Sequence, residues 1–382
     1  MLDAFDVMLY ALVLASLMTD LGMTKATAGL LGSATLIASA AGGLIFGVIA
    51  DRYGRTRALV GSILIYSVFT AASGLAQTVL QLAVFRALLG IGMGGEWASG
   101  AALVSETWPA AHRGKALGLM QSAWAVGYAA AAAVTAVVLP LWGWRAVFFV
   151  GVLPALFTIW IRRRVEEPVL WQRTREQAAP RGSLAAIFRG PLGRLTLAVT
   201  LMNACTMFAW WGFNLWIPAY LSLPPSAGGI GLAPHVMSGF IIAMQVGMWF
   251  GYVTFGFVSD SFGRKRTYIV YLVTAAVLIF SYGLTRTPWV LLVLGPFVAF
   301  FGTGYFTGFG AVTAEIYPTG IRATAQGFTY NLGRIASAVA PFLVGRVAET
   351  RGFGFALAMA SVAFLLAAVT WIWIPETRGR EL

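Results

Sequence analysis

Five ionisable side chains lie within stretches of sequence that are otherwise apolar: Asp3, Asp6, Arg86, Glu96 and Arg334. A charge at the centre of a bilayer costs about 3 kcal/mol or more, so each of these residues needs a partner or a task. A guanidinium can hold a carboxylate through two parallel hydrogen bonds, and a carboxyl removed from water tends to keep a proton. These residue types therefore offer the chemistry needed to bind an anion and a proton inside a membrane.

Arg334 is expected to lie deepest, about 17 Å along its apolar run and so near the bilayer midplane. Asn331 precedes it by one turn on the same helix face, and an amide beside a planar guanidinium suits a substrate carboxylate. The alternative is an internal ion pair with an acid of the other half of the chain. Uncharged side chains at similar depth are candidates for substrate contact or for helix packing: Gln121, Asn203, Gln245 and Tyr305.

The buried acids are candidates for proton coupling. Glu96 is expected about 15 Å from the cytoplasmic end of its helix, where loss of water favours the protonated form. Asp3 and Asp6 are one turn apart, and two neighbouring carboxylates resist double ionisation. For Glu96 the alternative is a structural pair with a neighbouring helix. For the two aspartates it is a position in the cytoplasmic headgroup zone.

The composition predicts helices that cross a membrane. The chain of 382 residues is 59% hydrophobic and 10% charged, whereas a soluble domain carries about 25% charged residues. Its apolar residues fall in twelve runs of roughly 18 to 27 residues, each long enough to cross a bilayer core as a helix. We therefore predict an all-α membrane protein with twelve transmembrane helices. The single cysteine, Cys205, excludes an internal disulfide.

The net charge of +12 is explained by membrane topology rather than by nucleic acid. Most lysines and arginines fall in the loops that follow even-numbered helices and in the basic segment 162–194. Positively charged loops remain in the cytoplasm, so both termini are predicted to be cytoplasmic. The chain opens directly within its first helix, and no cleavable signal peptide is expected.

An internal repeat divides the chain. IFGVIADRYGRTRA at 45–58 recurs as TFGFVSDSFGRKRT at 254–267, and SETWPAAHRGKALG at 105–118 recurs at the same offset as AEIYPTGIRATAQG at 314–327. We predict two pseudo-symmetric six-helix halves, 1–161 and 195–382, joined by a cytoplasmic linker, 162–194. Parallel repeats of this kind place a substrate site on the axis between the halves.

The predicted cytoplasmic loops carry acids and bases at matching positions in both halves. We interpret them as a charge latch that gates the inner side, and topology signalling by the arginines alone does not explain the paired glutamates. The residues assigned to this latch are Asp51, Arg55, Glu106, Arg113, Glu167, Asp260, Arg264, Glu315, Arg322 and Glu376.

Twelve spans with a doubled G-x-x-x-D-R/S-x-G-R loop resemble the major facilitator superfamily over nearly the whole chain. Within it, the segments Leu2–Asp6, Gly92–Trp97 and Tyr330–Arg334 are similar to the organic-acid:proton symporters, which include sialate, lactate and aromatic-acid carriers. The first motif departs from that group, with D-A-F-D where D-G-F-D is usual. The resemblance implies a proton-coupling role for Arg86, and the alternative is a side chain that snorkels outward.

The pattern favours a secondary active transporter for proton-coupled uptake of a small organic anion: a monocarboxylate, a sialate or an aromatic acid. The alternatives are a sugar or polyol porter, a proton-driven drug exporter of the same fold, and a membrane receptor or assembly subunit. Exporters of cations need cavity acids without a cavity arginine, which Arg334 contradicts. The two histidines, His112 and His235, have no metal or triad spacing, so no enzyme is expected. We expect a monomer in a bacterial inner membrane, with no cofactor, no metal and no nucleic-acid partner.

Overall fold

The structure, a computed structural model, describes residues 1–107, 110–167 and 184–378. This part of the chain is helical and contains no strand, as the long apolar runs predict. It forms two compact units, Met1–Ala179 with Leu215–Ile242, and Pro180–Asn214 with Ala243–Leu382. The boundaries expected from the repeat, 1–161 and 195–382, stay a prediction.

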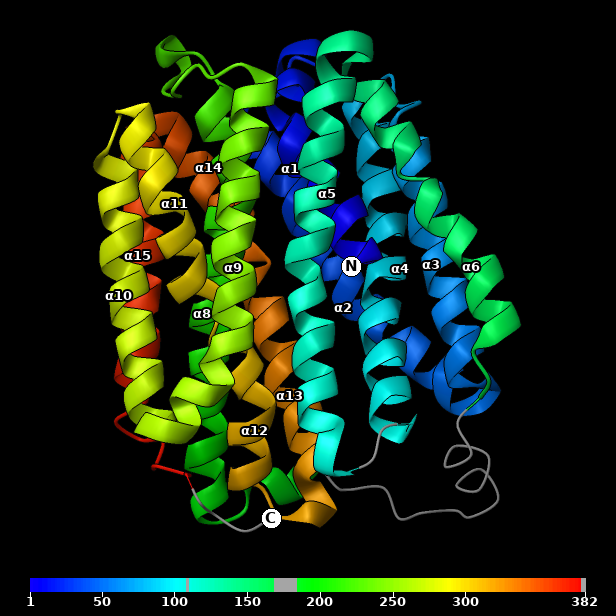
Figure 1. Ribbon diagram of the computed structural model, residues 1–382, viewed down its shortest axis with the longest axis vertical. Coiled ribbons are helices and arrows are strands. Elements are labelled where there is room, and N and C mark those ends of the chain that lie inside the picture. Colours follow the sequence, from blue (N-terminus) through cyan, green and yellow to red (C-terminus); the bar gives the residue numbers. More distant parts are fainter. Residues whose placement is uncertain (108–109, 168–183, 379–382) are drawn as a thin grey trace. The chain divides into compact units, whose positions relative to one another are not determined.

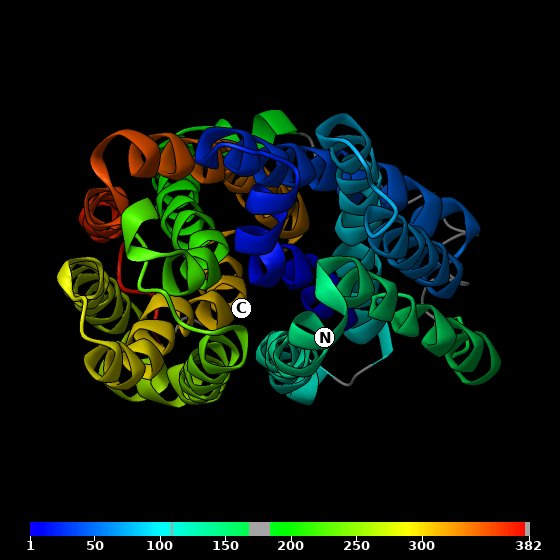
Figure 2. The same ribbon diagram turned by 90° about the horizontal axis from the view of Figure 1, so that it is seen from above.

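The first unit is built around α4, against which both α2 and α3 pack, while α1 packs on α5 (Figure 1). The view from above shows α2, α3 and α4 as one group (Figure 2). The Lys25 ammonium at the start of α2 donates to the Ala227 carbonyl at 2.7 Å, which ties η2 to this unit. Its elements are α1 (Leu2–Asp20), α2 (Lys25–Tyr53), α3 (Arg55–Ser73), α4 (Val79–Thr107), α5 (Ala110–Val150), α6 (Leu153–Arg164), the end of α8 (Pro191–Ser222), η2 (Pro225–Ala227) and the start of α9 (Pro234–Phe262).

Glycines allow α4 to approach its neighbours closely. A Cβ on Gly94 would collide with the Ser39 carbonyl of α2, and a Cβ on Gly92 would come within 2.6 Å of the Tyr66 backbone nitrogen of α3. Small residues at helix contacts let backbones pack in lipid, where no hydrophobic effect drives helices together. The glycine-rich stretch before Glu96 therefore serves helix packing.

The second unit holds the remaining helices. Here α10 packs against α11 and α15, α14 packs against α15, and α12 packs against α13. Its elements are η1 (Leu184–Phe188), the first part of α8, the rest of α9, α10 (Arg264–Leu284), α11 (Pro288–Thr303), α12 (Phe306–Ile316), α13 (Thr319–Ser337), α14 (Val339–Arg351) and α15 (Phe353–Thr370).

Several crossings are bent or broken. Among the described residues, ten stretches are long and apolar enough to span a membrane, and one of them runs for 41 residues through α5. A φ of 75° at Gly143 breaks that stretch. α13 and α14 are separated at Ala338 and are 19 and 13 residues long. The ten stretches and the bent helices together accommodate the twelve predicted crossings.

Candidate functional site

A cluster of buried polar side chains lies in the first unit, where α1, α3 and α4 contact one another. Asp6 of α1 and Arg86 of α4 are 0% and 1% exposed. Glu96 and Asp3 interact electrostatically with Asp6, and so does Arg86. The structure thus brings together the four residues that the sequence assigns to proton coupling.

Many polar atoms of this cluster are unsatisfied. Both carboxylate oxygens of Asp6, Oε2 of Glu96, and Nε and Nη1 of Arg86 are buried without a hydrogen-bond partner among the described residues. The guanidinium carbon of Arg86 lies 4.5 Å from the centroid of the Tyr10 ring, which gives this cation an aromatic neighbour. Buried polar atoms are seldom left unpaired, so the carboxyls are available to take up or release a proton, and the guanidinium is available to bind water or an anion.

Sequence reasoning missed the contribution of α3. Tyr66 is fully buried, its hydroxyl has no hydrogen-bond partner among the described residues, and it interacts electrostatically with Glu96. The signal was a stripe of hydroxyls at helical spacing, all of them buried: Ser62, Tyr66, Thr70 and Ser73. Ser73 donates back within α3 at 2.8 Å, whereas Thr70 and Ser67 lie beside the Asp6 carboxyl, so that α3 brings several hydroxyls to the acids.

In the second unit, Arg334 lies in the last turn of α13 and is 6% exposed. Its side chain has no ion pair and no hydrogen bond with any described residue. Its guanidinium carbon lies 5.7 Å from the centroid of the Tyr330 ring. The negative end of the α13 dipole favours a cation here even without a carboxylate. Within its own unit the Arg334 side chain thus has no carboxylate partner, and an ion pair with an acid of the other half stays the alternative to substrate contact.

Two amides expected near the substrate donate hydrogen bonds to the backbone of α13. Asn203 of α8 donates to the Thr329 carbonyl of α13 at 3.1 Å. Gly333 allows this contact, because a Cβ there would come within 2.5 Å of the Asn203 amide nitrogen. Asn331 donates to the Gly327 carbonyl at 2.9 Å, one turn back on α13. The Asn203 contact joins α8 to α13, the Asn331 contact lies within α13, and substrate contact by these amides stays a prediction.

The other uncharged candidates differ in how fully they are satisfied. The Tyr305 hydroxyl donates to the Thr206 carbonyl at 3.5 Å. Gln245 is buried, and its side-chain oxygen has no partner among the described residues. Gln121, in the first unit, is partly exposed. No group of acids, histidines and cysteines in the described part of the chain is arranged to hold a metal ion.

Three of the predicted latch residues form ion pairs at one end of the second unit. Arg264 pairs with Asp260 one turn away and with Glu315 at 3.1 Å. The Thr377 hydroxyl donates to the other oxygen of Glu315. These contacts join α9, α10, α12 and the segment after α15 within one unit.

Glu167 caps the start of α3 in the first unit. Its two carboxylate oxygens accept from the backbone N–H groups of Thr56 and Arg57, each at 3.2 Å. The preceding Gly54 has a φ of 118°, and a Cβ there would collide with the Glu167 carboxylate. Glycine is therefore needed both for the backbone conformation and for the approach of the carboxylate.

Glu376 caps α10 in the same way. Its carboxylate accepts from the N–H groups of Arg264 and Lys265 at 2.9 and 3.1 Å, next to Gly263 with a φ of 96°. Partial burial raises the pKa of Glu376, but the backbone N–H groups of Arg378, Arg264 and Lys265 outweigh burial and hold its pKa below the ordinary value. The two halves of the repeat thus share one device, a distant glutamate on a helix start.

The rest of the latch is only partly visible. The side chains of Asp51, Glu106 and Arg113 lie outside the described residues. Arg322 donates through Nε to the Tyr317 carbonyl at 3.2 Å, and Arg55 has polar contacts of its own. The described contacts fall within single units, and a latch between the halves stays a prediction.

The cap formed by Glu376 is expected to stabilise the folded protein. Glu376→Gln should lower the stability of the purified protein by about 1 kcal/mol near neutral pH. A carboxylate with a lowered pKa stabilises above its ordinary pKa of about 4.3 and loses that effect as the pH falls through the lowered value. Thermal unfolding in detergent should show that the difference in stability between the wild type and Glu376→Gln becomes smaller as the pH is lowered from 7 towards 3. The control is Glu349→Gln, which replaces an exposed acid of α14. A difference in stability that does not depend on pH would show that the Glu376 carboxylate does not act as a cap.

Comparisons with known proteins agree on one family. The model of the Major Facilitator Superfamily matches residues 1–249 and 221–382. A putative metabolite transport protein of Haemophilus influenzae is 33% identical, over 100% of this chain and 95% of its own length. A probable 4-methylmuconolactone transporter of Cupriavidus pinatubonensis is 36% identical, over 99% and 88%. The sialic acid transporter NanX of Escherichia coli is 32% identical, over 95% and 88%.

Solved structures show the same fold. The crystal structure of a D-xylose-proton symporter superposes with a TM-score of 0.80 at 22% identity, covering 100% of this chain and 97% of that one. At that identity the likeness concerns the fold alone. With two matches of the family that together span the chain and relatives above 30% identity, the chain belongs to the major facilitator superfamily and is an integral membrane transporter, not an enzyme.

Proposed function

We propose that this transporter carries a small organic anion together with a proton across the bacterial inner membrane by alternating access. The observation that carries the proposal is Arg334, a buried guanidinium with no ion pair among the described residues. An unpaired cation in an apolar environment is costly unless a ligand neutralises it. A carboxylate can do so with two parallel hydrogen bonds.

The surroundings of Arg334 favour an aromatic or otherwise planar acid. The Tyr330 ring lies beside the guanidinium, and its centroid is 5.8 Å from that of Phe309 on α12. A Cβ added to Gly310 or Gly327 would meet no other atom within 4 Å, so the helix surfaces near these rings are open. The names of the relatives include both 4-methylmuconolactone and sialic acid and leave the shape of the ligand open. The paired rings of Tyr330 and Phe309 favour a flat ligand, because aromatic faces stack on planar ligands.

The coupling proton is assigned to the cluster of Asp6, Glu96 and Arg86, with Asp3 and Tyr66 beside it. Carboxyls that are buried and unsatisfied can alternate between a neutral and a charged form as water gains access. Arg86 interacts electrostatically with Asp6, so a movement of α1 against α4 would alter the balance of charge in the cluster. This is the response that coupling requires.

The remaining assignments complete the transport cycle. The halves 1–161 and 195–382 are proposed to move about the substrate axis, with both termini and the linker 162–194 in the cytoplasm. The loop charges are proposed to latch the inner side in alternate states. A monomer is sufficient for this cycle.

Uptake into proteoliposomes tests the proposal. Purified protein should accumulate benzoate or muconate when the inward proton gradient is present and only equilibrate them when it is collapsed. Lactate and sialate should be accumulated less, and xylose should not be accumulated. Accumulation of xylose without uptake of any acid would show that the substrate is a sugar and not an organic anion. If the uptake of acids is the same with and without the proton gradient, transport is not coupled to protons.

A further inference from the structure

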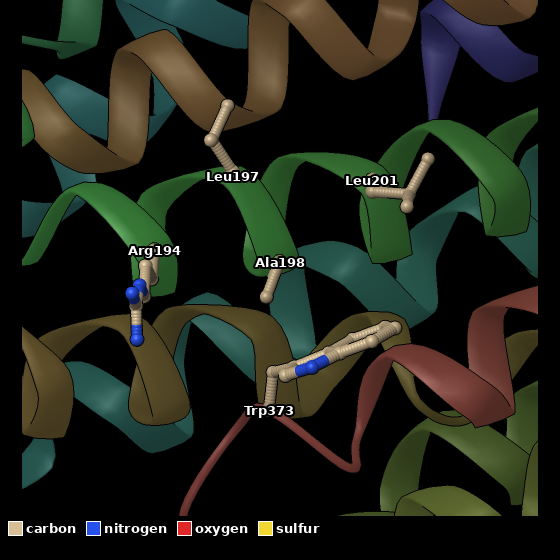
Figure 3. Close-up of a pocket in the computed structure, with 5 residues that line it drawn as sticks. All are labelled: Arg194, Leu197, Ala198, Leu201 and Trp373. Carbon is tan, nitrogen blue, oxygen red and sulfur yellow. The ribbon is translucent and has the colours of Figure 1, made fainter.

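A groove outside the polar sites lies on the surface of the second unit, between the start of α8 and the turn that follows α15. It has a volume of about 260 Å³ and is lined by Arg194, Leu197, Ala198, Leu201 and Trp373 (Figure 3). A water molecule occupies about 30 Å³ of liquid, so the groove has room for a ligand of several carbon atoms.

The lining is set by one face of α8. Residues 194, 197, 198 and 201 follow the three- and four-residue spacing of a helix face. On the opposite face, the Thr196 hydroxyl donates to the Ile187 carbonyl at 2.7 Å and accepts from the Tyr317 hydroxyl at 3.1 Å. These bonds fix the start of α8 and turn its apolar face outward.

The exposed residues of the groove belong to a membrane span. Leu197 and Leu201 are 63% and 51% exposed, within a stretch that is apolar and long enough to cross a bilayer. Trp373 is 59% exposed, and its ring extends along the groove beside Ala198, as Figure 3 shows. Exposed leucines on such a stretch face acyl chains, and exposed tryptophans at helix ends face the headgroup zone. Lipid is therefore the medium that covers this groove.

Arg194 adds a charge at one end of the groove. It lies in the first turn of α8, is exposed, and makes no ion pair or side-chain hydrogen bond with a described residue. A cation at this depth, on the side proposed to be cytoplasmic, lies at the level of lipid phosphates. Each basic residue near an anionic membrane surface contributes about 1 kcal/mol to lipid binding.

We propose that this groove binds one anionic glycerophospholipid of the cytoplasmic leaflet, with its phosphate on Arg194 and an acyl chain between the two leucines and Trp373. A concave site with a cation at one end and an aromatic ring along its side selects a lipid, whereas a flat apolar surface does not. The site is separate from the residues proposed to bind substrate and proton.

Native mass spectrometry of the full protein tests the proposal. The protein is extracted gently from liposomes that hold equal amounts of phosphatidylglycerol and phosphatidylcholine, without any transport substrate. The wild type should retain one phosphatidylglycerol molecule in about fivefold preference, and Arg194→Gln should retain the two lipids equally. Arg194→Lys keeps the charge and should keep most of the preference. Trp373→Leu should weaken retention of both lipids.

Matched variants make the outcome decisive. Arg189→Gln removes another exposed cation just before α8, and Trp289→Leu removes another exposed ring of the second unit. Both should behave as wild type. Equal retention of the two lipids by the wild type, or an equal loss in Arg189→Gln, would overturn the proposal. Displacement of the bound lipid by inorganic phosphate would reassign the groove to a free anion. If Arg194→Gln does not fold, lipid retention by Arg194→Lys and Trp373→Leu tests the proposal in its place. Because no substrate is present, failure here leaves the transport proposal standing.

Discussion

Replacing Arg334 by lysine should abolish high-affinity binding of the carboxylate substrate. Lysine keeps the positive charge but lacks the planar fork that holds two carboxylate oxygens at once. Removing the partner altogether, in Arg334→Ala, should cost about 2–4 kcal/mol, a loss of roughly 30- to 1,000-fold in affinity, and lysine should not restore this loss. Isothermal titration of purified protein with the best substrate from the uptake screen measures this directly.

Arg351→Lys is the control for that experiment. Arg351 also lies over an aromatic ring of the second unit, with its guanidinium carbon 5.0 Å from the Phe355 centroid, but it is exposed. The Arg351→Lys variant should bind substrate with the same affinity as the wild type. Unchanged affinity in both Arg334→Lys and Arg334→Ala would show that the substrate site lies elsewhere, and the guanidinium would then serve only the end of α13.

Replacing Glu96 by glutamine should separate substrate movement from the proton gradient. Glutamine mimics the protonated carboxyl permanently, so the variant should still bind and exchange substrate. It should lose accumulation driven by a pH gradient, because no proton is released on the inner side. Counterflow and gradient-driven uptake, measured side by side in the same liposomes, distinguish the two activities.

Asp6→Asn is the informative comparison, since Asp6 lies deeper in the same cluster and also leaves its oxygens unpaired. Glu349→Gln, an exposed acid, should leave both activities intact. Full gradient-driven accumulation in Glu96→Gln would make Glu96 a structural residue. Loss of accumulation only in Asp6→Asn would then move the proton to α1.

The fold followed readily from the sequence because length, apolar runs and the repeated loop are all local properties of the chain. The buried charges were conspicuous for the same reason, since Asp6 or Arg86 stands out in an apolar run. Their grouping was expected only in outline, because it depends on how α1, α3 and α4 pack. The glycines of α4 let those helices approach one another, and only the packed structure shows which backbones they meet.

Aromatic side chains were the main omission. Tyr66 and Tyr330 were not singled out as site residues, because composition does not separate a core ring from one beside an acid or a guanidinium. Asn203 shows the converse case, where an amide at the expected depth bonds to the backbone of a neighbouring helix. Only the packing of α8 against α13 reveals which group it meets.

The glutamate caps were also hidden, because each one depends on residues far apart in the chain. Glu167 follows Thr56 by 111 residues, and Glu376 follows Arg264 by 112. A carboxylate on a helix start therefore cannot be recognised from local sequence, although the glycine that admits it can.

Those separations have a consequence for biosynthesis. Glu167 is the last part of its cap to leave the ribosome, roughly 6 to 20 s after Thr56 at ordinary rates of translation. The start of α3 must wait that long for its carboxylate, while the helices between them are inserted. Yet this cap can close before any helix of 195–382 has been synthesised. The first of the two caps can thus form while the second half of the chain is still being made.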